Sequence, residues 1–544
     1  MIQCPSCGEN LKFDIKSQKM ACEACHNQFD PYQFDSKVSD GIEGKELDEN
    51  DYEVTVFTCP QCGGEILSTD NAAAGFCSFC GASTILYTRI SKEHRPNYII
   101  PFKKTKEDCK QAYSNMVKKA LFAPKELKDV SKIDSFRGIY MPYWAFYLTQ
   151  KGPVTLKGSK SKRHGDYIIT DHFSLNSNVD AYYKGLSYDA SSSFSDSISE
   201  AIAPYDVKGM KAFTPAYLSG FYADTPDVPS DVYQPDAMEF ANKETLDKVE
   251  KNFSGYSIDS TVTVSGRTNL LHTKVEGVDQ AMFPVWFMSY RNGDRVAYAT
   301  VNGQTGKVVC DLPVDIRKYL LGSLLLAIPI FLILCLFFTA TPHTLLTISA
   351  LIAAVASVIS CVEAVKIARK EGNLDDKGKL AVADPAVAEA AQAEAAKAAT
   401  KAAKKAKKKK DPLSSALLTF ISIVVVINVL YIPFASSSSS RLGYAVAWLV
   451  IVIAEVVAFA IGAKKISDVP DKKGFTGLIT AMVSICIGAL VMIINPTSDL
   501  VYYVASVLTL IAEFFTLKGV MDEYNILSTQ KLPQFDKQGG DDRA

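Results

Sequence analysis

The sequence predicts a multidomain protein with two small β-rich zinc ribbons, an α+β soluble domain and an all-α region of six transmembrane helices. Three observations predict this architecture. Two identical four-cysteine frames open the chain, the middle mixes helical and strand patterns, and the last part holds apolar runs too long for a soluble helix. A chain of 544 residues is long enough for several such units.

Changes of composition set the boundaries of these units. The 58 Lys and Arg residues nearly cancel the 59 Asp and Glu residues, so the chain has no overall basic field that would gather nucleic acid. We divide the chain into ribbon 1 at 1–35, an acidic linker at 36–55, ribbon 2 at 56–92, the α+β domain at 93–316, transmembrane hairpin 1 at 319–366, an Ala/Lys-rich helical linker at 367–412, hairpin 2 at 413–463, hairpin 3 at 475–518 and a tail at 519–544.

Eight of the thirteen cysteines form two frames of the pattern C-x2-C-x14-C-x2-C, offset by 55 residues: Cys4, Cys7, Cys22, Cys25 and Cys59, Cys62, Cys77, Cys80. Two residues between cysteines form a tight knuckle that directs both sulfurs at one ion, which favours tetrahedral coordination of Zn²⁺. Four thiolates leave no open position for water. We therefore expect two structural zinc sites that supply folding energy.

Disulfides and iron–sulfur clusters are the alternatives for paired cysteines. Disulfides need an oxidising compartment, which the topology derived below disfavours. His26 follows Cys25, but we interpret it as a solvated side chain because the frame already supplies four thiolates. The other cysteines occur singly, and we assign them no chemistry: Cys109, Cys310, Cys335, Cys361 and Cys486.

The soluble middle of the chain alternates between helical and strand patterns. A helix is expected at 105–121, capped by Thr105 and Asp108. Its predicted apolar stripe consists of Cys109, Ala112, Met116 and Ala120. Strands are expected at 260–266, 282–290, 295–302 and 308–312, and their short turns RNGDR and GQTGK predict an antiparallel meander at the end of the domain.

Residue patterns in the soluble part do not predict an enzyme. The GQTGK segment resembles the end of a phosphate loop, but Val301 and Val308 occupy the positions that need Gly and Ser or Thr. The histidines form no metal-spaced pair, and the sequence contains no nucleophile elbow. We interpret the aromatic clusters IYMPYWAFYL and MFPVWFMSY as core strands rather than as stacking surfaces for bases.

Long uncharged runs predict the membrane region. Residues 319–362 contain no Asp, Glu, Lys or Arg, which fits two spans joined by a tight turn. Similar runs predict further spans at 413–434, 442–462, 475–494 and 500–517. Six helices in three hairpins result.

Charges in the loops predict the orientation. Residues 367–412 hold twelve Lys and Arg and residues 463–474 hold four, while the opposite turns hold only Arg441. This asymmetry places both termini in the cytoplasm of a multi-pass cell-membrane protein. The chain begins MIQCPSCGEN, so we expect no secretory signal peptide.

Two further groups of charged residues belong to the membrane half. A block of lysines directly before the third span is expected to attract anionic lipids: Lys404, Lys405, Lys407, Lys408, Lys409 and Lys410. The second helix of each hairpin carries one acid, namely Glu363, Glu455 and Glu513. Only Glu455 is expected to lie deep in the membrane, since the other two are expected near the interface, where water or Lys366 and Lys518 can satisfy them.

A string of short motifs resembles a known family over about residues 1–313. After the two ribbons come YIIPFKKTKED, LFAPKEL, RGIYMPYWAF, TPAYLSGFYA and FPVWFMSYRNGDRVAYATVNGQTGKV, which resemble the YdjG-like bacterial proteins, zinc-ribbon membrane proteins of the general-transcription-factor type. The resemblance implies an association with envelope-stress proteins of the phage-shock type. The long multi-span C-terminal half departs from the shorter members of that family.

These observations predict a membrane-anchored scaffold, not an enzyme, that recruits cytoplasmic proteins to the bacterial membrane. A nucleic-acid-binding regulator is the first alternative, but acidic residues throughout 1–50 would repel phosphates. A transporter or channel is the second alternative, and it rests on Glu455. The oligomeric state stays open, a homo-oligomer included.

Overall fold

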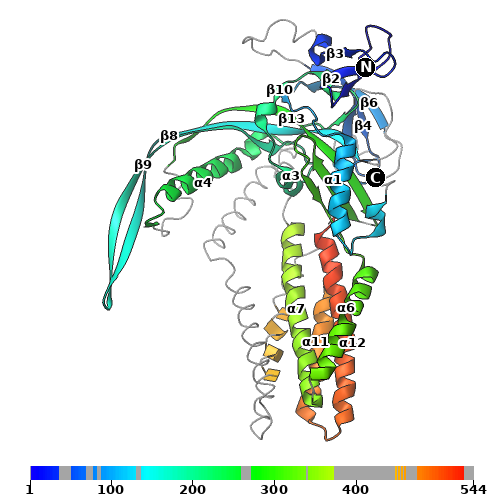
Figure 1. Ribbon diagram of the computed structural model, residues 1–544, viewed down its shortest axis with the longest axis vertical. Coiled ribbons are helices and arrows are strands. Elements are labelled where there is room, and N and C mark those ends of the chain that lie inside the picture. The colour runs from blue at the N-terminus through cyan, green and yellow to red at the C-terminus, as the bar shows by residue number, and fades with distance from the viewer. Residues whose placement is uncertain are drawn as a thin grey trace, which may run out of the picture.

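A computed structural model describes residues 2–35, 51–68, 77–81, 87–129, 136–258, 271–293, 295–337, 341–372 and 475–531, with separate positions between 448 and 460. It has two parts, a broad sheet with a long two-stranded arm and a bundle of long helices (Figure 1). The predicted strand at 260–266, the six lysines of 404–410 and the predicted span at 413–434 lie outside the described residues.

The first cysteine frame folds as a small antiparallel sheet of β1 (Leu11–Asp14), β2 (Lys19–Cys22) and β3 (Gln28–Phe29). Its strands bury one face, as half-covered antiparallel strands do. The ring of Phe13 meets Tyr217 edge-on, with 5.0 Å between centroids. The backbone N–H of Phe13 donates to Ser219 O at 3.1 Å. The small sheet is therefore docked on the large domain.

The other described strands join one sheet whose main path runs β10-β7-β13-β8-β11-β5-β4-β6. Its members are β4 (Asp51–Thr58), β5 (Glu65–Ser68), β6 (Tyr87–His94), β7 (Tyr98–Ile99), β8 (Arg137–His164), β9 (Tyr167–Asp189), β10 (Lys211–Ala212), β11 (Tyr222–Ala223), β12 (Ser257–Ile258), β13 (Thr273–Asn292), β14 (Arg295–Asn302), β15 (Val308–Cys310) and β16 (Gln530–Lys531). Because β4 and β5 flank the first knuckle of the second cysteine frame, that frame lies within the large sheet instead of forming a ribbon of its own.

Central strands of this sheet are buried on both faces. In β13, Phe283 and Phe287 enter one core cluster, whereas the intervening Trp286 enters the other. In β8, Tyr140 and Tyr143 are divided in the same way. The aromatic clusters are thus core strands, as predicted. The predicted meander is also confirmed, since β13, β14 and β15 pair antiparallel in sequence order.

The helix α1 (Lys106–Lys119) begins as predicted, because Thr105 and Asp108 form a reciprocal capping box. The predicted apolar stripe is only partly right. Cys109 is buried, but Tyr113 and Val117 complete the buried row. Tyr113 occupies the buried face of the helix, where its hydroxyl also donates to Leu127 O at 3.1 Å. Two further helices cover the sheet, α3 (Asp196–Ile202) and α4 (Gln234–Asn252).

The strands β8 and β9 continue beyond the sheet as a two-stranded arm, which the sequence analysis did not predict (Figure 1). Helix α4 runs along this arm and covers its inner face. The apolar part of this contact joins Val154, Leu156, Leu175 and Val179 of the arm to Leu246 and Val249 of α4. Nearer the sheet, Gln150 binds α4 through Asn242 and Thr245.

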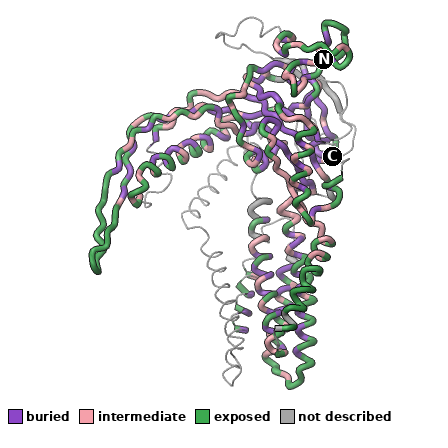
Figure 2. Tube along the Cα trace, viewed as in Figure 1, coloured by how far each residue is buried: buried purple, intermediate pink, exposed green. Residues whose placement is uncertain are grey.

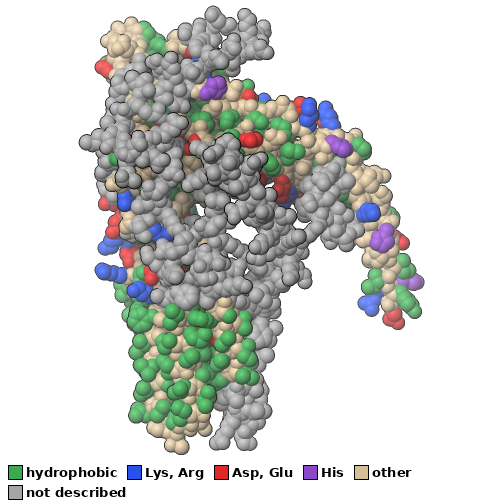
Figure 3. Space-filling view, turned by 180° about the vertical axis from the view of Figure 1, so that it is seen from behind, with side chains coloured by type: hydrophobic (Ala, Val, Ile, Leu, Met, Phe, Trp, Pro, Cys, Tyr) green, Lys and Arg blue, Asp and Glu red, His purple; other side chains and the backbone are tan. Residues whose placement is uncertain are grey.

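The described C-terminal residues form four helices long and apolar enough to cross a membrane: α6 (Ile316–Phe337), α7 (Pro342–Gly372), α11 (Phe475–Ile494) and α12 (Asp499–Leu527). Six were predicted, and of the span at 442–462 only separate helical positions are described. The outer faces of these helices are exposed (Figure 2), yet hydrophobic side chains cover them (Figure 3). Such a continuous apolar belt is typical of a membrane protein.

The start of α6 and the end of α12 are fixed to the sheet at the same end of the bundle. Val314 N–H donates to Asn525 Oδ1 at 2.7 Å, and Asn525 Nδ2 donates back to Val314 O at 3.0 Å. Arg295 of β14 donates to Thr529 Oγ1 at 2.7 Å and to Thr529 O at 2.9 Å. Beyond α12, β16 adds to the edge of β14. These contacts connect the soluble domain firmly to the helices.

Candidate metal centres

The four cysteines of the first frame come together as the sequence predicts. Cys4 Sγ lies 3.6 Å from Cys25 Sγ, and Cys7 Sγ lies 3.4 Å from Cys22 Sγ. Four sulfurs at about 2.3 Å from one tetrahedral Zn²⁺ are roughly 3.8 Å apart. The group can therefore hold Zn²⁺. His26 is exposed and is not part of the group, in agreement with its interpretation as a solvated side chain.

The second frame gives a group of the same shape. The Sγ atoms of Cys59 and Cys80 are 3.8 Å apart, and so are those of Cys62 and Cys77. All four cysteines are buried. The distances again match the separation expected for a tetrahedral zinc ion. The second group can hold Zn²⁺ in a closed sphere that water does not reach.

A tight backbone turn forms each knuckle. The residue four positions after the first cysteine donates its N–H to that cysteine's carbonyl, at 2.9 Å for Gly8 and 2.9 Å for Gly63. Both glycines have positive φ, +77° and +71°, which costs glycine little. Gly81 and His26 close the other two knuckles in the same conformation. The sequence predicts the two cysteine groups well because these turns depend on local residues.

The two groups differ in what surrounds them. Ala24 lies between the last two cysteines of the first frame and is exposed, whereas the corresponding residue of the second frame is Phe79, which is 1% exposed. The ring of Phe79 contacts Phe287 of β13, with centroids 6.2 Å apart. The carbonyl of Phe79 accepts from the Tyr298 hydroxyl at 2.8 Å. The second group is therefore built into the core of the sheet, and the first lies at its surface.

Tyr298 supports the second group as a neutral hydrogen-bond donor. Its side chain is buried beside the cysteine sulfurs, and burial raises the pKa of Tyr298 well above its ordinary value. Nearby thiolates would act in the same direction, because they disfavour a second negative charge. The phenol therefore keeps its proton at neutral pH.

Two of the single cysteines outside the frames have properties of core residues. Burial raises the pKa of Cys109 to about 12 and that of Cys310 to about 12. Cys310 Sγ lies 3.6 Å from the Met116 sulfur. A thiol that stays protonated is a weak nucleophile and a weak metal ligand. This agrees with the assignment of no chemistry to these residues.

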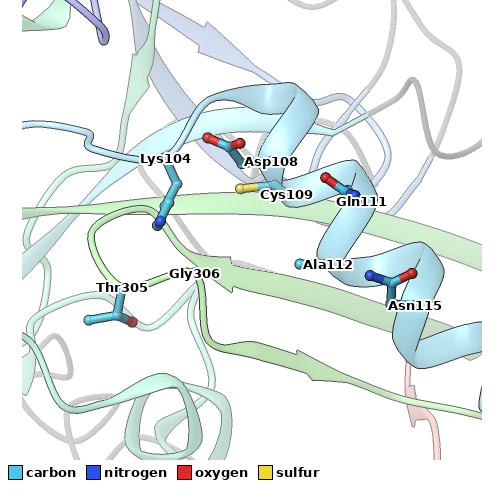
Figure 4. A pocket seen from close by; sticks show the side chains of 8 residues that line it. All are labelled: Lys104, Asp108, Cys109, Gln111, Ala112, Asn115, Thr305 and Gly306. Carbon is cyan, nitrogen blue, oxygen red and sulfur yellow. The ribbon is translucent and has the colours of Figure 1, made fainter.

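A pocket of about 270 Å³ lies between α1 and the GQTGK turn (Figure 4). The turn connects the antiparallel strands β14 and β15, and Lys307 Nζ donates to Ala203 O at 2.5 Å. This geometry differs from a phosphate loop, in which a helix follows the turn. Asp108 supplies the only carboxylate of the pocket lining, and it accepts the Thr105 N–H of the capping box. The pocket is thus lined by residues that shape the helix start and the turn.

The predicted intramembrane acids have different environments. Glu363 pairs with Lys366 at 2.7 Å, as expected. Glu455 is 1% exposed and accepts the Ser357 hydroxyl at 2.9 Å. The expectation that Glu513 lies near the interface, within reach of water or Lys518, is wrong, because Glu513 is 4% exposed and neither of its carboxylate oxygens has a hydrogen-bond partner among the described residues. Helix α12 turns Glu513 into the bundle, away from the interface.

Glu523 is a buried acid that the sequence analysis missed. It accepts the Ser360 hydroxyl of α7 at 2.7 Å. The predicted span ended at 517, but α12 continues to Leu527. A detectable signal was the row Glu513, Thr516, Gly519 and Glu523, whose spacing of three and four residues places small and polar residues on one helical face.

Part of the chain is similar to a known bacterial protein. The chain is 29% identical over 320 residues to a protein of Bacillus subtilis (strain 168) described as uncharacterized protein YdjG. The similarity covers 58% of this chain and 91% of that protein. No protein-family model and no solved structure matches the chain. The chain is therefore similar to YdjG, and a large part of its sequence has no counterpart there.

Proposed function

We propose that this protein is a non-catalytic membrane scaffold that holds Zn²⁺ in both cysteine groups and recruits cytoplasmic proteins to the bacterial membrane. The observation that supports this function best is the position of the first cysteine group. It lies at the end of the molecule opposite the helical bundle (Figure 1). An exposed, rigid binding surface held at a fixed distance from a membrane is what a recruiting protein needs.

Contacts between the first group and the sheet support a rigid display. Asp35, just after the small sheet, forms a buried ion pair with Arg95, which also donates to Phe213 O. The Tyr32 hydroxyl donates to Ala212 O at 3.0 Å. Gln18 Nε2 donates to Phe102 O at 2.8 Å. Fixing a binding surface in advance lowers the entropy lost when a partner binds.

The chemistry of this surface favours a protein partner over nucleic acid. The exposed acids of the small sheet and its turns, Glu9, Glu23 and Asp30, equal in number the exposed Lys12, Lys16 and Lys19, so this described surface has no excess of cations. Carboxylates repel the phosphate backbone, whose neutralisation by Lys and Arg supplies most non-specific affinity. The resemblance to YdjG-like proteins adds envelope-stress proteins of the phage-shock type as proposed partners.

Zinc content tests the first part of the proposal. We expect two Zn²⁺ per chain in the purified protein, because both groups match the sulfur separation of a tetrahedral site. Elemental analysis measures the ratio of metal to protein. Iron in place of zinc, or less than one zinc per chain, is incompatible with the proposal.

A substitution at the repeat-matched position tests recruitment. Ser6 and Gln61 occupy the same place in the two frames, and both are exposed. We expect Ser6→Arg combined with Ala24→Arg to reduce copurification of partners several-fold, because these residues form the exposed face of the first group. Gln61→Arg is the control, since it adds one arginine at the repeat-matched position near the second group, where it also replaces the hydrogen bond from Arg291. Equal copurification by both variants would exclude the first group as the binding surface.

We also propose that both termini lie in the cytoplasm. The support is the difference in Lys and Arg between the loops and the contact of Val314 with Asn525, which places the start of α6 and the end of α12 at one end of the bundle. Reporter fusions after Gly372 and within residues 436–440 are expected to give opposite signals. Identical signals at the two positions would rule out this topology.

A transporter or channel is the second candidate, and the buried acids favour it. Glu513 has no hydrogen-bond partner among the described residues, and one oxygen of Glu455 and one of Glu523 also lack a partner there. Buried carboxylates within membrane helices are costly and often mark an ion or proton path. Under this hypothesis Glu455→Gln and Glu513→Gln abolish transport, and the first cysteine group is dispensable.

A further inference from the structure

The end of the β8–β9 arm is exposed on both faces. Helix α4 covers the arm as far as Leu156 and Leu175, and β12 pairs with it at Gly158 and Ser159. Every residue from Lys160 to Ser174 is exposed. A two-stranded ribbon with no covered face is only marginally stable in water. In the arm tip, defined as residues 160–174, Lys160 and Phe173 contact the ring of Tyr256. The residues between these two have the structure of a segment that needs a contact outside the described domain.

Three consecutive apolar residues follow the turn at the arm tip. Tyr167 is 77% exposed, Ile168 71% and Ile169 52%. Because successive residues of a strand point to opposite faces, these side chains surround the tip instead of forming one stripe. The two-residue turn of Gly165 and Asp166 holds them at its end, with Gly165 at a φ of +63°. Exposed apolar runs of this kind mark an interaction site.

The arm carries this tip toward the helices. In Figure 1 the arm curves away from the sheet and descends beside the bundle, so that its tip is level with the upper part of α7. Figure 3 shows the tip level with the upper edge of the apolar belt. Arg295 of β14 binds Thr529, just after α12, and so connects the bundle to the sheet from which the arm extends. A bilayer around the apolar belt would therefore have its surface at the height of the tip.

Charge at the tip suits an anionic membrane surface. Lys160, Lys162 and Arg163 precede the turn, and the carboxylates within 160–174 are Asp166 and Asp171. Cross-strand pairs place Lys162 opposite Ile169 and Arg163 opposite Ile168. Cationic side chains beside aromatic and aliphatic ones are the composition of segments that lie in the membrane interface.

We propose that the arm tip inserts Tyr167, Ile168 and Ile169 into the headgroup region of the bilayer that contains the protein's own helices, with Lys162 and Arg163 binding anionic lipid headgroups. The soluble domain then has a second contact with the membrane, at a distance from the helical bundle. Two separate contacts prevent the domain from tilting and keep the first cysteine group directed away from the bilayer. This inference goes beyond recruitment and requires only that the bundle lie in a membrane.

Tryptophan fluorescence in nanodiscs tests the proposal with the full-length protein. Tyr167→Trp adds a fluorophore at the tip. The fluorescence of the three native tryptophans is measured in the parent protein and subtracted. Interfacial segments lie about 5–10 Å into the boundary between headgroups and acyl chains, so lipids brominated near the top of the chain should quench about half or more of the added fluorescence. Tyr182→Trp is the matched control, because Tyr182 is 60% exposed on the same arm but lies near its base.

The outcomes separate insertion from other contacts. Quenching in Tyr167→Trp but not in Tyr182→Trp supports insertion of the tip. Equal quenching in both variants, or none in Tyr167→Trp although the protein is incorporated in the discs, overturns it. In discs with anionic lipid we expect stronger quenching than in purely zwitterionic discs, and adding Lys162→Glu and Arg163→Glu should abolish that difference. A difference that survives these substitutions overturns the proposed role of the two cations.

Discussion

Replacing Cys77 by serine is expected to unfold the sheet domain, whereas replacing Cys22 is expected to unfold only the small sheet β1–β3. Cys77 is buried in the same core cluster as Phe287 and Tyr298, and the strands β4 and β5 next to its group lie inside the large sheet. A structural zinc ion contributes on the order of 10 kcal/mol in small metal domains. The free energy of unfolding of a whole domain is only about 5–15 kcal/mol. Loss of zinc binding at the second group is therefore expected to remove most of the stability of the sheet domain.

Hydrogen exchange measured by mass spectrometry separates these two results. In Cys77→Ser we expect loss of protection across β8, β13 and β14, because their aromatic side chains pack on the second group. In Cys22→Ser the loss is expected to stop at the small sheet, which meets the domain at its surface through Phe13 and Tyr217. Protection patterns that are the same in both variants would show that the two groups do not differ in this way.

Replacing Arg295 by alanine is expected to detach the end of α12 from the sheet. The guanidinium donates hydrogen bonds to the hydroxyl and the carbonyl of Thr529, and a third to Ile526 O at 2.8 Å. Hydrogen bonds from a charged donor contribute about 1.5–3 kcal/mol each. Because solvent weakens all three at this partly exposed site, we expect their loss to cost roughly 3 kcal/mol in total. We expect hydrogen exchange in β16 and the last turn of α12 to accelerate about 100-fold, since each 1.4 kcal/mol is about tenfold.

Arg291→Ala provides the control for this prediction. Arg291 lies on the same hairpin but is exposed and bonds to Gly293 O and Gln61 Oε1, away from α12. The Arg291→Ala substitution should leave the hydrogen exchange of β16 unchanged. If both variants accelerate exchange equally, Arg295 is not the residue that connects sheet and bundle.

Local patterns predicted much of this structure. The cysteine knuckles, the capping box at Thr105 and the meander of β13 to β15 each depend on residues close together in sequence. Features that depend on distant contacts were missed. The packing of Phe79 on Phe287 joins residues more than two hundred positions apart, so a repeat that looks like two equal ribbons gives one surface group and one core group.

The arm and the burial of Glu523 were missed for the same physical reason. The alternation along β8 and β9 is clear only when α4 is known to cover one face, because the other face is polar. Glu523 lies beyond the apolar run, and its burial depends on the contact with Ser360 of α7. In both places a neighbour distant in sequence decides which side chains are buried.

The most direct test of the proposed function is to crosslink membranes and identify the proteins that copurify with each of three full-length variants. These variants are Ser6→Arg with Ala24→Arg, Gln61→Arg, and Glu455→Gln. The scaffold account predicts that partners are lost only from the first variant, whose changed side chains lie on the exposed face opposite the bundle. Glu455→Gln removes a buried charge but little volume, so recruitment should continue at the parent level. Loss of the same partners from Glu455→Gln, with normal recruitment by the first variant, would contradict the account and favour a function within the membrane helices.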